Sequence, residues 1–268
     1  MRALYLLLGD PVAHSRSPAI HARAFSLLGV DAVYAPCRVS DAVSAMAAAR
    51  TLGVAGFNVT VPHKEAMAEL VDKIESHAAR IGAVNCVVRE GDALVGHNTD
   101  APGLLRALRA GGVSVAGARA VIVGAGGAGR AAAWALVPHA SKITILNRTE
   151  RKARALASLI QAASGLCDVA SLDSAGPLAD ATLVVQCTSI GLSSNDLPFD
   201  PSVLRKDCTL VDLVYAPGGK TALLERFAGR TVDGIEVLVH QAIASLEIWL
   251  RRPQLDHLAG ALREAALA

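Results

Sequence analysis

Short apolar runs, each bounded by glycine or polar residues, recur along the whole chain and alternate with stretches of helical pattern. A short aliphatic or β-branched run that stops at a turn predicts a strand in a sheet. Strands are predicted at residues 3–8, 32–39, 56–61, 83–89, 93–97, 120–123, 142–146, 182–186, 209–214 and near 231–233. Helices are predicted at 19–28, 41–52, 104–110, 130–136, 238–252 and 254–267. Another helix is predicted to begin near residue 65, and a long one that follows residues 147–149 is predicted to end near residue 163. This alternation indicates an α/β fold.

The strand predicted at residues 120–123 runs directly into a glycine-rich turn and then into a helix. Gly124, Gly126 and Gly129 have the spacing G-x-G-x-x-G. Between a strand and a helix, such glycines allow a tight turn, close approach of the backbone to a pyrophosphate, and close helix–strand packing. The free N–H groups and the positive dipole end of the helix then face the phosphates. The motif predicts a dinucleotide site, with an ordinary glycine turn as the alternative.

The end of the next strand bears on which dinucleotide is bound. An NAD site places Asp or Glu about 20 residues beyond the glycines. Here Asn147 and Arg148 stand at that place, with Arg151 and Lys152 one helical turn further on. Guanidinium and ammonium groups suit the 2′-phosphate of NADP, and Glu150 can begin the helix facing solvent. The motif favours NADP over NAD and over a merely solvated, basic helix start.

Polar residues also stand at predicted strand ends and turns in the first hundred residues. Each has a local explanation, such as a helix cap at Ser17 or Asp100, turn hydrogen bonds at Asn58, or a solvated Lys64. Together they suit a small polyhydroxylated ligand that carries a carboxylate, because ligands of α/β sheets bind at the carboxyl ends of strands. Lys64 and Asp100 are the titratable pair, and a cation can stabilise the negative oxygen that hydride addition to a carbonyl creates. The set is Ser15, Ser17, Asn58, Thr60, Lys64, Asn85 and Asp100.

Composition narrows the class of protein. Hydrophobic residues make up 52% of the 268 residues and charged residues 19%, which is ample for a core and unlike a disordered chain. The net charge of +2 gives no sign of a nucleic-acid surface. The five cysteines are scattered without a C-x-x-C, and no H-E-x-x-H occurs, so we expect reduced thiols and no metal site. The apolar run at residues 3–8 is too short for a membrane span or a secretory signal. We expect a cytoplasmic protein without membrane contact.

The motifs, taken in order, resemble the shikimate dehydrogenase family over essentially the whole length. The S-x-S-P, N-V-T-V-P-x-K and N-T-D motifs form a highly specific set. The matching segments are Gly9-Asp10-Pro11, His14-Ser15-Arg16-Ser17-Pro18, Asn58-Val59-Thr60-Val61-Pro62-His63-Lys64, Gly82-Ala83-Val84-Asn85, Asn98-Thr99-Asp100, Gly124 to Gly129, Asn147-Arg148-Thr149 and Gln241-Ala242.

The resemblance implies a role for each matching position. Lys64 would be the acid–base residue, with Asp100 as its partner. The substrate-binding residues would be Ser15 and Ser17 for the carboxylate, and Thr60, Lys64, Asn85, Asp100, Tyr215 and Gln241 for the rest of the pocket. The cofactor-binding residues would be Gly124, Ala125, Gly126, Gly127, Ala128 and Gly129 at the pyrophosphate, Asn147, Arg148, Thr149 and Lys152 at the 2′-phosphate, and Leu213 and Gly234 beside the nicotinamide.

The chain departs from the family pattern at a few positions. Ala101 stands after Asp100 where Gly is frequent, and Val237 stands where Met is frequent beside the nicotinamide. Gln186-Cys187 replaces a common Asn-Ala, and Lys152 keeps a positive charge where Arg is often found, without its bidentate fork. None of these lies in the expected substrate set, so they bear on cofactor affinity.

The expected architecture has two α/β domains with a cleft between them. Residues 1–102, completed by helices at 238–268, would form the substrate-binding and catalytic domain, and residues 103–237 a Rossmann NADP-binding domain. The family resemblance implies reversible reduction of 3-dehydroshikimate to shikimate by NADPH, a step of chorismate and aromatic amino-acid biosynthesis. It leaves room for a homodimer and gives no reason to expect nucleic acid as a partner.

Two alternatives stay open. One is a sibling enzyme that acts on quinate with NAD, or on an amino analogue of shikimate; the Asn147-Arg148-Thr149 motif and the serine pair argue against it. The other is a nucleotide-sensing or scaffold protein with an inactive site, against which the presence of both Lys64 and Asp100 argues.

Overall fold

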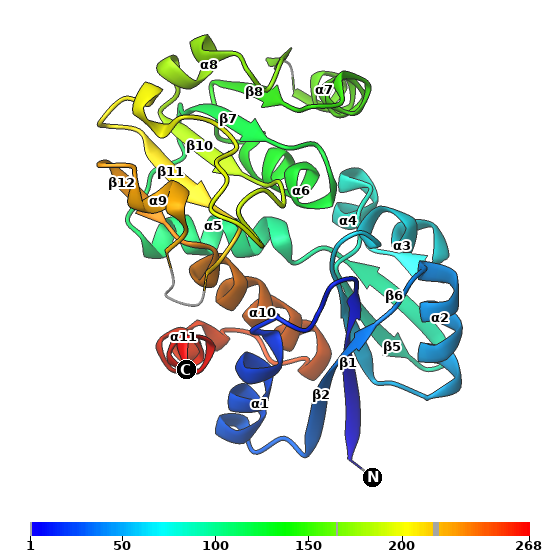
Figure 1. Ribbon diagram of the computed structural model, residues 1–268. Helices are drawn as coiled ribbons and strands as arrows, with labels where there is room; N and C mark the ends of the chain where they lie inside the picture. The colour runs from blue at the N-terminus through cyan, green and yellow to red at the C-terminus, as the bar shows by residue number, and fades with distance from the viewer. Residues whose placement is uncertain (1, 165, 217–219) are drawn as a thin grey trace. The chain divides into compact units, whose positions relative to one another are not determined.

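The computed structural model describes residues 2–164, 166–216 and 220–268. The chain divides into two compact units (Figure 1). The N-terminal unit comprises Met1–Gly103 together with Val239–Ala268, and the central unit comprises Leu104–Leu238. Each unit is built on a sheet of its own.

The N-terminal unit contains a mixed six-stranded sheet with the order β2-β1-β3-β5-β6-β4. Strand β1 pairs in parallel with β2 and β3, whereas β5 runs antiparallel to both β3 and β6. The strands are β1 (Ala3–Gly9), β2 (Ala32–Arg38), β3 (Gly56–Val59), β4 (Lys73–Ile74), β5 (Cys86–Glu90) and β6 (Ala93–His97). The expected hairpin around Gly91 is the β5–β6 pair.

Successive apolar side chains of β1 point to opposite faces of this sheet, and helices pack on both faces. Leu6 and Leu8 join a core that includes Met46 of α2 and Met67 of α3. Tyr5 points to the other face, where its ring centroid lies 4.6 Å from that of Trp249 in α10. The helices that begin and end in this unit are α1 (Ser17–Leu28), α2 (Ala42–Thr51), α3 (Lys64–Leu70), α4 (Ser76–Ile81) and α11 (Ala259–Leu267), preceded by the 3-10 turn η2 (Leu255–Leu258).

Two helices each belong partly to one unit and partly to the other. Helix α5 (Asp100–Ala110) begins in the N-terminal unit, and α10 (Gly234–Leu250) ends in it. Trp249 at the end of α10 donates a hydrogen bond from Nε1 to the Val87 carbonyl oxygen of β5 at 2.9 Å. Helix α11 packs against α1, so the C-terminal segment completes the core of the N-terminal unit.

The central unit is a six-stranded sheet in which every pair is parallel, with the order β12-β11-β10-β7-β8-β9. Read from β9, this is the 3-2-1-4-5-6 order of the Rossmann fold. The central strands are buried almost throughout because helices cover both faces. The elements are β7 (Arg119–Val123), α6 (Gly127–Leu136), β8 (Lys142–Leu146), α7 (Glu150–Ser164), β9 (Cys167–Ala170), α8 (Ala175–Asp180), β10 (Leu183–Gln186), η1 (Pro201–Val203), β11 (Thr209–Asp212), α9 (Ala222–Glu225) and β12 (Arg230–Val232).

The structure differs from the sequence expectation mainly at element ends. Helix α5 begins at Asp100 and not at residue 104, because the Asn98 side chain accepts from the Ala101 N–H at 3.2 Å and Pro102 is tolerated in a first turn. Helix α10 begins at Gly234, four residues before the expected start. Short elements β4, α4, β9, α8 and α9 were not expected, since such short segments carry too little periodicity to be distinguished.

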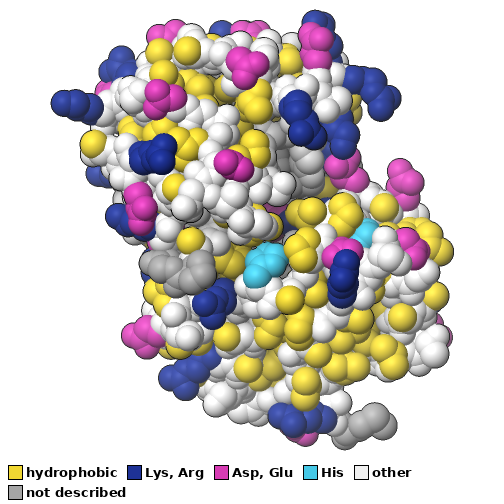
Figure 2. All heavy atoms as spheres, in the orientation of Figure 1, with side chains coloured by type: hydrophobic (Ala, Val, Ile, Leu, Met, Phe, Trp, Pro, Cys, Tyr) yellow, Lys and Arg dark blue, Asp and Glu magenta, His cyan; other side chains and the backbone are white. Residues whose placement is uncertain are grey.

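The surface is mixed in charge. Lys and Arg side chains are interspersed with Asp and Glu over the face seen in Figure 2, in keeping with the net charge of +2. Within residues 2–164, 166–216 and 220–268, no helix is both long and apolar enough to cross a membrane.

Candidate active site

The topology of the N-terminal sheet gathers polar residues at one edge. Strands β1 and β3 are parallel, so their carboxyl ends meet there, and the antiparallel β5 begins at that same edge while β6 ends at it. The register pairs Asn58 with Cys86 and Cys86 with His97. Segments that are far apart in sequence, around residues 60, 85 and 98, therefore lie together.

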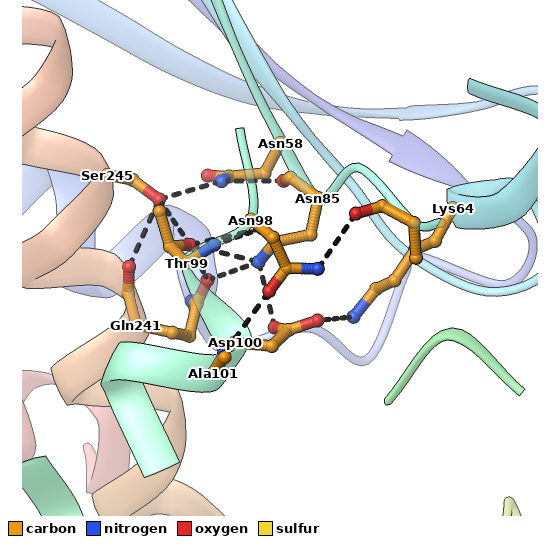
Figure 3. A network of polar contacts seen from close by, with 10 residues as sticks. Asn58, Lys64, Asn85, Asn98, Thr99, Asp100, Ala101, Gln241 and Ser245 are labelled. Carbon is orange, nitrogen blue, oxygen red and sulfur yellow. Dashed lines mark hydrogen bonds and ion pairs between the residues drawn. The ribbon is translucent and has the colours of Figure 1, made fainter. Parts of the chain in front are cut away.

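An ion pair between Lys64 and Asp100 lies at this edge. The Lys64 Nζ and Asp100 Oδ2 atoms are 2.6 Å apart, and the two side chains are 15% and 17% exposed (Figure 3). Each residue begins a helix, Lys64 in α3 and Asp100 in α5. A carboxylate in the first turn of a helix is favoured by the helix dipole. The pair places an ammonium group, held by a carboxylate that also accepts from Asn85, at this edge of the sheet.

Asn85 and Gln241 belong to the same network. Asn85 donates from Nδ2 to Asp100 Oδ1 at 2.8 Å, so both carboxylate oxygens of Asp100 have a donor. The Gln241 Oε1 atom lies 3.4 Å from Asn85 Nδ2 and 3.4 Å from Thr99 Oγ1. Four expected site residues, Lys64, Asn85, Asp100 and Gln241, are thus brought together (Figure 3). They come from α3, the residue before β5, α5 and α10 respectively.

The two expected carboxylate-binding serines lie at the start of α1. The Ser17 N–H donates to Ser15 Oγ at 3.2 Å, which places both hydroxyls at the N-terminus of this helix. His21 donates from Nδ1 to the Ser17 carbonyl oxygen at 2.8 Å. Burial lowers the pKa of His21 to about 4, so the ring is neutral at pH 7 and its Nδ1 carries the proton. Ser17 belongs to the helix itself and does not precede it as a cap. A helix N-terminus with two hydroxyls suits an anionic group.

Thr60 follows β3 at the same sheet edge. Its N–H donates to the Leu8 carbonyl oxygen at 2.9 Å, and its carbonyl oxygen accepts from the His63 N–H at 3.0 Å. The turn from β3 into α3 is therefore fixed at both ends, which places Thr60 between the carboxyl end of β1 and Lys64.

Gly124, Gly126 and Gly129 in the turn of the central unit are glycine for three different reasons. Gly124 has φ +110°, a conformation that other residues rarely adopt. A Cβ on Gly129 would collide with the Gly124 carbonyl oxygen, so packing demands glycine there. A Cβ on Gly126 would meet no described atom within 4 Å, and its φ of −85° is ordinary. Since neither the conformation nor packing requires glycine at 126, open backbone for a close ligand is the remaining reason, and this fits a dinucleotide.

Asn147 ties the end of β8 to the glycine turn. Its Oδ1 accepts from the Ala125 N–H at 3.2 Å, and its Nδ2 donates to the Thr149 carbonyl oxygen at 2.8 Å. Arg148 and Lys152 beside it are exposed. Glu150 is paired with Arg154, with 2.6 Å between Oε1 and Nη2. The acidic residue is thereby neutralised along its own helix, and the surroundings of Asn147 stay basic.

The residues expected beside the nicotinamide follow β11. Leu213 donates from its N–H to the Gln186 carbonyl oxygen at 2.9 Å. A Cβ on Gly234 would lie 2.8 Å from the Leu213 carbonyl oxygen, so these two positions are close neighbours. Tyr215, which was expected to bind substrate, is half-buried two residues further on.

Three further buried polar residues take part in the network, and sequence reasoning gave two of them, Thr99 and Ser245, no site role. Asn58 was expected among the polar residues that suit a ligand, with turn hydrogen bonds as the alternative, and its side chain contacts Tyr34, Asn85 and Ser245. Thr99 lies inside the N-T-D motif, and Ser245 is a polar residue in an otherwise apolar stretch of α10. A small polar side chain at a core position of a helix is the signal that could have marked Ser245.

The described residues contain no group of His, Cys, Asp and Glu that could hold a metal ion, and all five cysteines are free.

Comparison with known proteins identifies the family. A model of the shikimate dehydrogenase substrate binding domain matches residues 7–87, and one of shikimate / quinate 5-dehydrogenase matches residues 106–192. The shikimate dehydrogenase (NADP(+)) of Haloarcula marismortui is 42% identical over 97% of this chain and 98% of its own. The chain belongs to the shikimate dehydrogenase family. A second member, from Symbiobacterium thermophilum, is 41% identical over 98% of this chain and 92% of its own.

A solved member of the family has the same fold. The shikimate 5-dehydrogenase of Thermus thermophilus, in complex with NADP(H) and shikimate, is 33% identical with a TM-score of 0.86, and the match covers 98% of each chain. The α/β fold expected from the sequence is confirmed.

Proposed function

We propose that this protein is an NADP-dependent shikimate dehydrogenase, an oxidoreductase that reversibly reduces 3-dehydroshikimate to shikimate. The observation that carries the proposal is the Lys64–Asp100 ion pair, held by Asn85 in a network with Gln241, in a chain of this family. Relatives that share about two fifths of the sequence over nearly the whole chain bear this name, and a similar structure contains both ligands. The reaction is a step of chorismate and aromatic amino-acid biosynthesis.

The substrate offers a carboxylate and several hydroxyls, and the site residues divide accordingly. Ser15 and Ser17, with the N-terminus of α1, bind the carboxylate because hydroxyls and free N–H groups donate to anions. Side chains at the sheet edge bind the hydroxyls through amide, hydroxyl and carboxylate groups. These are Thr60, Asn85, Asp100 and Gln241. Tyr215 of the central unit is the further residue to which the family resemblance gives a substrate role.

The acid–base step belongs to Lys64. In the direction of reduction, the bound cofactor supplies a hydride to the ketone carbon. Lys64 donates a proton from Nζ to the ketone oxygen, and in the reverse direction it accepts that proton. Asp100 fixes Nζ and balances its charge, while Asn85 fixes Asp100. A positive group beside the oxygen stabilises the charge that hydride transfer builds there.

The central unit binds the cofactor. The turn from Gly124 through Ala125, Gly126, Gly127 and Ala128 to Gly129 carries the pyrophosphate on backbone N–H groups at the start of α6. Asn147, Arg148, Thr149 and Lys152 take the 2′-phosphate, and Leu213 and Gly234 border the nicotinamide. Two exposed cations in place of an acidic residue favour NADP.

The division of labour and the cellular setting are part of the same proposal. The N-terminal unit binds substrate, in agreement with the match of residues 7–87 to a substrate binding domain, and the central unit binds NADP. The five free cysteines fit the reducing conditions of a cytoplasm. A homodimer is the assembly we propose, and sedimentation of the purified protein tests it.

A cofactor and substrate panel tests the function. The initial rate of nicotinamide reduction is measured with shikimate or quinate, each with NADP⁺ or NAD⁺. We expect the largest kcat/KM for shikimate with NADP⁺. A larger value for quinate with NAD⁺ would identify the sibling enzyme, and no turnover in any of the four combinations would contradict an active dehydrogenase.

A further inference from the structure

A buried hydroxyl group, that of Ser245 in α10, joins the Lys64–Asp100 network to the interior of the N-terminal unit. Ser245 is fully buried, and its Oγ lies within hydrogen-bond distance of Asn58, Thr99 and the Gln241 carbonyl oxygen (Figure 3). We propose that Ser245 is a positioning residue: it fixes the orientation of the Asn85 amide, and through it the Asp100 carboxylate that holds Lys64. This inference rests on the proposed function.

The partners of Asn58 determine how its side-chain amide is oriented. The backbone carbonyl oxygen of Asn85 can only accept a hydrogen bond, and it lies 3.1 Å from one terminal atom of the Asn58 side-chain amide. That terminal atom must therefore be the nitrogen. The other terminal atom is then Oδ1, and it accepts from the Tyr34 hydroxyl at 2.9 Å. The second hydrogen on the Asn58 nitrogen points to Ser245 Oγ at 3.0 Å, so Ser245 accepts from Asn58.

The second step is the direction of the hydroxyl protons. Ser245 has one proton, and the Gln241 carbonyl oxygen 3.1 Å away can only accept. When Ser245 donates to that oxygen, the Thr99 hydroxyl at 3.1 Å donates to Ser245. Thr99 Oγ1 then has its lone pairs free to accept from Asn85 Nδ2 at 3.0 Å. In this arrangement the hydroxyl protons of Ser245 and Thr99 and both amide protons of Asn58 have acceptors.

The third step reaches the ion pair. The Thr99 backbone N–H can only donate, and it lies 2.6 Å from Asn85 Oδ1. The Asn85 nitrogen is thus turned toward Thr99 Oγ1 and Asp100 Oδ1. Asp100 Oδ1 accepts from this nitrogen, which leaves Oδ2 to accept from Lys64 Nζ. Without an acceptor at residue 245, the Thr99 proton would turn to Asn85 Oδ1 or Gln241 Oε1, at 3.3 and 3.4 Å, and Thr99 Oγ1 would no longer keep a lone pair directed at Asn85 Nδ2. The Asn85 amide would then be held by the Thr99 backbone N–H and would lose its second contact with Thr99.

The competing explanation is that Ser245 only packs a helix. A serine in a helix can satisfy itself by donating to the carbonyl oxygen four residues earlier, as Ser245 does with Gln241. Two further partners, from β3 and from the segment before α5, have no part in that explanation. The two explanations differ in what happens to kcat when the hydroxyl is removed.

Three variants separate them. Ser245→Ala removes the hydroxyl, Ser245→Thr keeps it, and Ile243→Val removes one methyl group from a fully buried residue of the same helix. Each is compared with the wild type for shikimate oxidation by NADP⁺, for Tm, and for hydrogen exchange of the Asn85 side-chain amide in ¹⁵N-labelled protein without ligands.

We expect Ser245→Ala to lower kcat about tenfold, equivalent to roughly 1.4 kcal/mol, while KM for NADP⁺ stays the same. Exchange of the Asn85 amide protons should become faster. Ser245→Thr should recover most of kcat, and Ile243→Val should lower Tm without lowering kcat. A Ser245→Ala enzyme with wild-type kcat and wild-type exchange would overturn the inference alone. Absence of turnover by the wild type would overturn the proposed function and this inference with it.

Discussion

Two buried titratable groups should give the two units opposite responses to pH. His21 of the N-terminal unit and Asp212 of the central unit are almost inaccessible to solvent. Burial lowers the pKa of His21 to about 4, from 6.5. Burial raises the pKa of Asp212 to about 6, from 3.8, although Thr221 and the Val214 N–H donate to its carboxylate. Neither residue takes part in the proposed chemistry, so stability can be measured separately from activity.

The sign of each effect follows from the protonation states. Between about pH 4 and 6.5 the unfolded chain binds a proton at His21 that the folded protein does not, so this group's contribution to stability is present above 6.5 and is lost as the pH falls. Between about pH 4 and 6 the folded protein binds a proton at Asp212 that the unfolded chain does not, so that contribution is present at low pH and is lost as the pH rises.

The magnitudes are similar. One pKa unit corresponds to about 1.4 kcal/mol, so the change from 6.5 to about 4 at His21 amounts to roughly 3 kcal/mol, and that at Asp212 is about the same. A charged His21 is costly because its Nε2 has no hydrogen-bond partner among the described residues.

The assay is urea unfolding of the wild type, His21→Phe and Asp212→Asn at a series of pH values from 4 to 7.5. The free energy of unfolding of each variant relative to the wild type removes the contributions of all other groups. Relative to the wild type, His21→Phe should lose stability as the pH rises, and Asp212→Asn should gain it. Trp249 lies in the N-terminal unit and Trp134 in the central unit, so fluorescence of a Trp134→Phe background reports the unit of His21. Two difference curves that are flat, or that slope the same way, would refute the reasoning.

Two further predictions concern the cofactor. Arg148→Ala should raise KM for NADPH roughly 10- to 100-fold, the loss of a charge-assisted hydrogen bond, with a much smaller effect on NADH; Arg205→Ala, which removes an exposed arginine paired with Asp207, is the control. Equal effects on both cofactors would overturn the 2′-phosphate assignment. Gly126→Ala should keep the wild-type Tm and raise KM for both cofactors, because the added Cβ meets no described protein atom and occupies the space left for the pyrophosphate. Gly129→Ala should lose about 1–3 kcal/mol of stability or more, because its Cβ would collide with the Gly124 carbonyl oxygen; the reverse ranking in Tm would contradict the assignment of the two glycines.

Much of the fold followed from local pattern. The buried strands at residues 120–123 and 142–146 and the glycine turn between strand and helix are determined by neighbours in sequence, and the structure places β7, β8 and α6 there. The short β4 and α4 contain too few residues to show a hydrophobic period. They depend on contacts with distant parts of the folded chain, such as the pairing of β4 with β6. The start of α5 depended on the Asn98 cap, which replaces four expected loop residues by a helical turn.

Most residues of the site could be predicted from the sequence, but the hydrogen bonds between their side chains could not. Lys64, Asn85 and Asp100 stand in motifs, and their common position at one sheet edge follows once β5 is known to be antiparallel to β3. Ser245 lies 146 positions after Thr99, the residue it contacts, so no local pattern links them. Only the packing of α10 against the sheet brings that hydroxyl to the network.

In the proposed function, Lys64 performs the acid–base step of shikimate oxidation by NADP⁺. The most direct test compares kcat of the wild type with that of Lys64→Met under saturating shikimate and NADP⁺, together with the Kd of each protein for shikimate. The account predicts a fall in kcat of roughly 10²- to 10⁴-fold with a much smaller change in Kd. A Lys64→Met enzyme that turns over shikimate at the wild-type rate would contradict it.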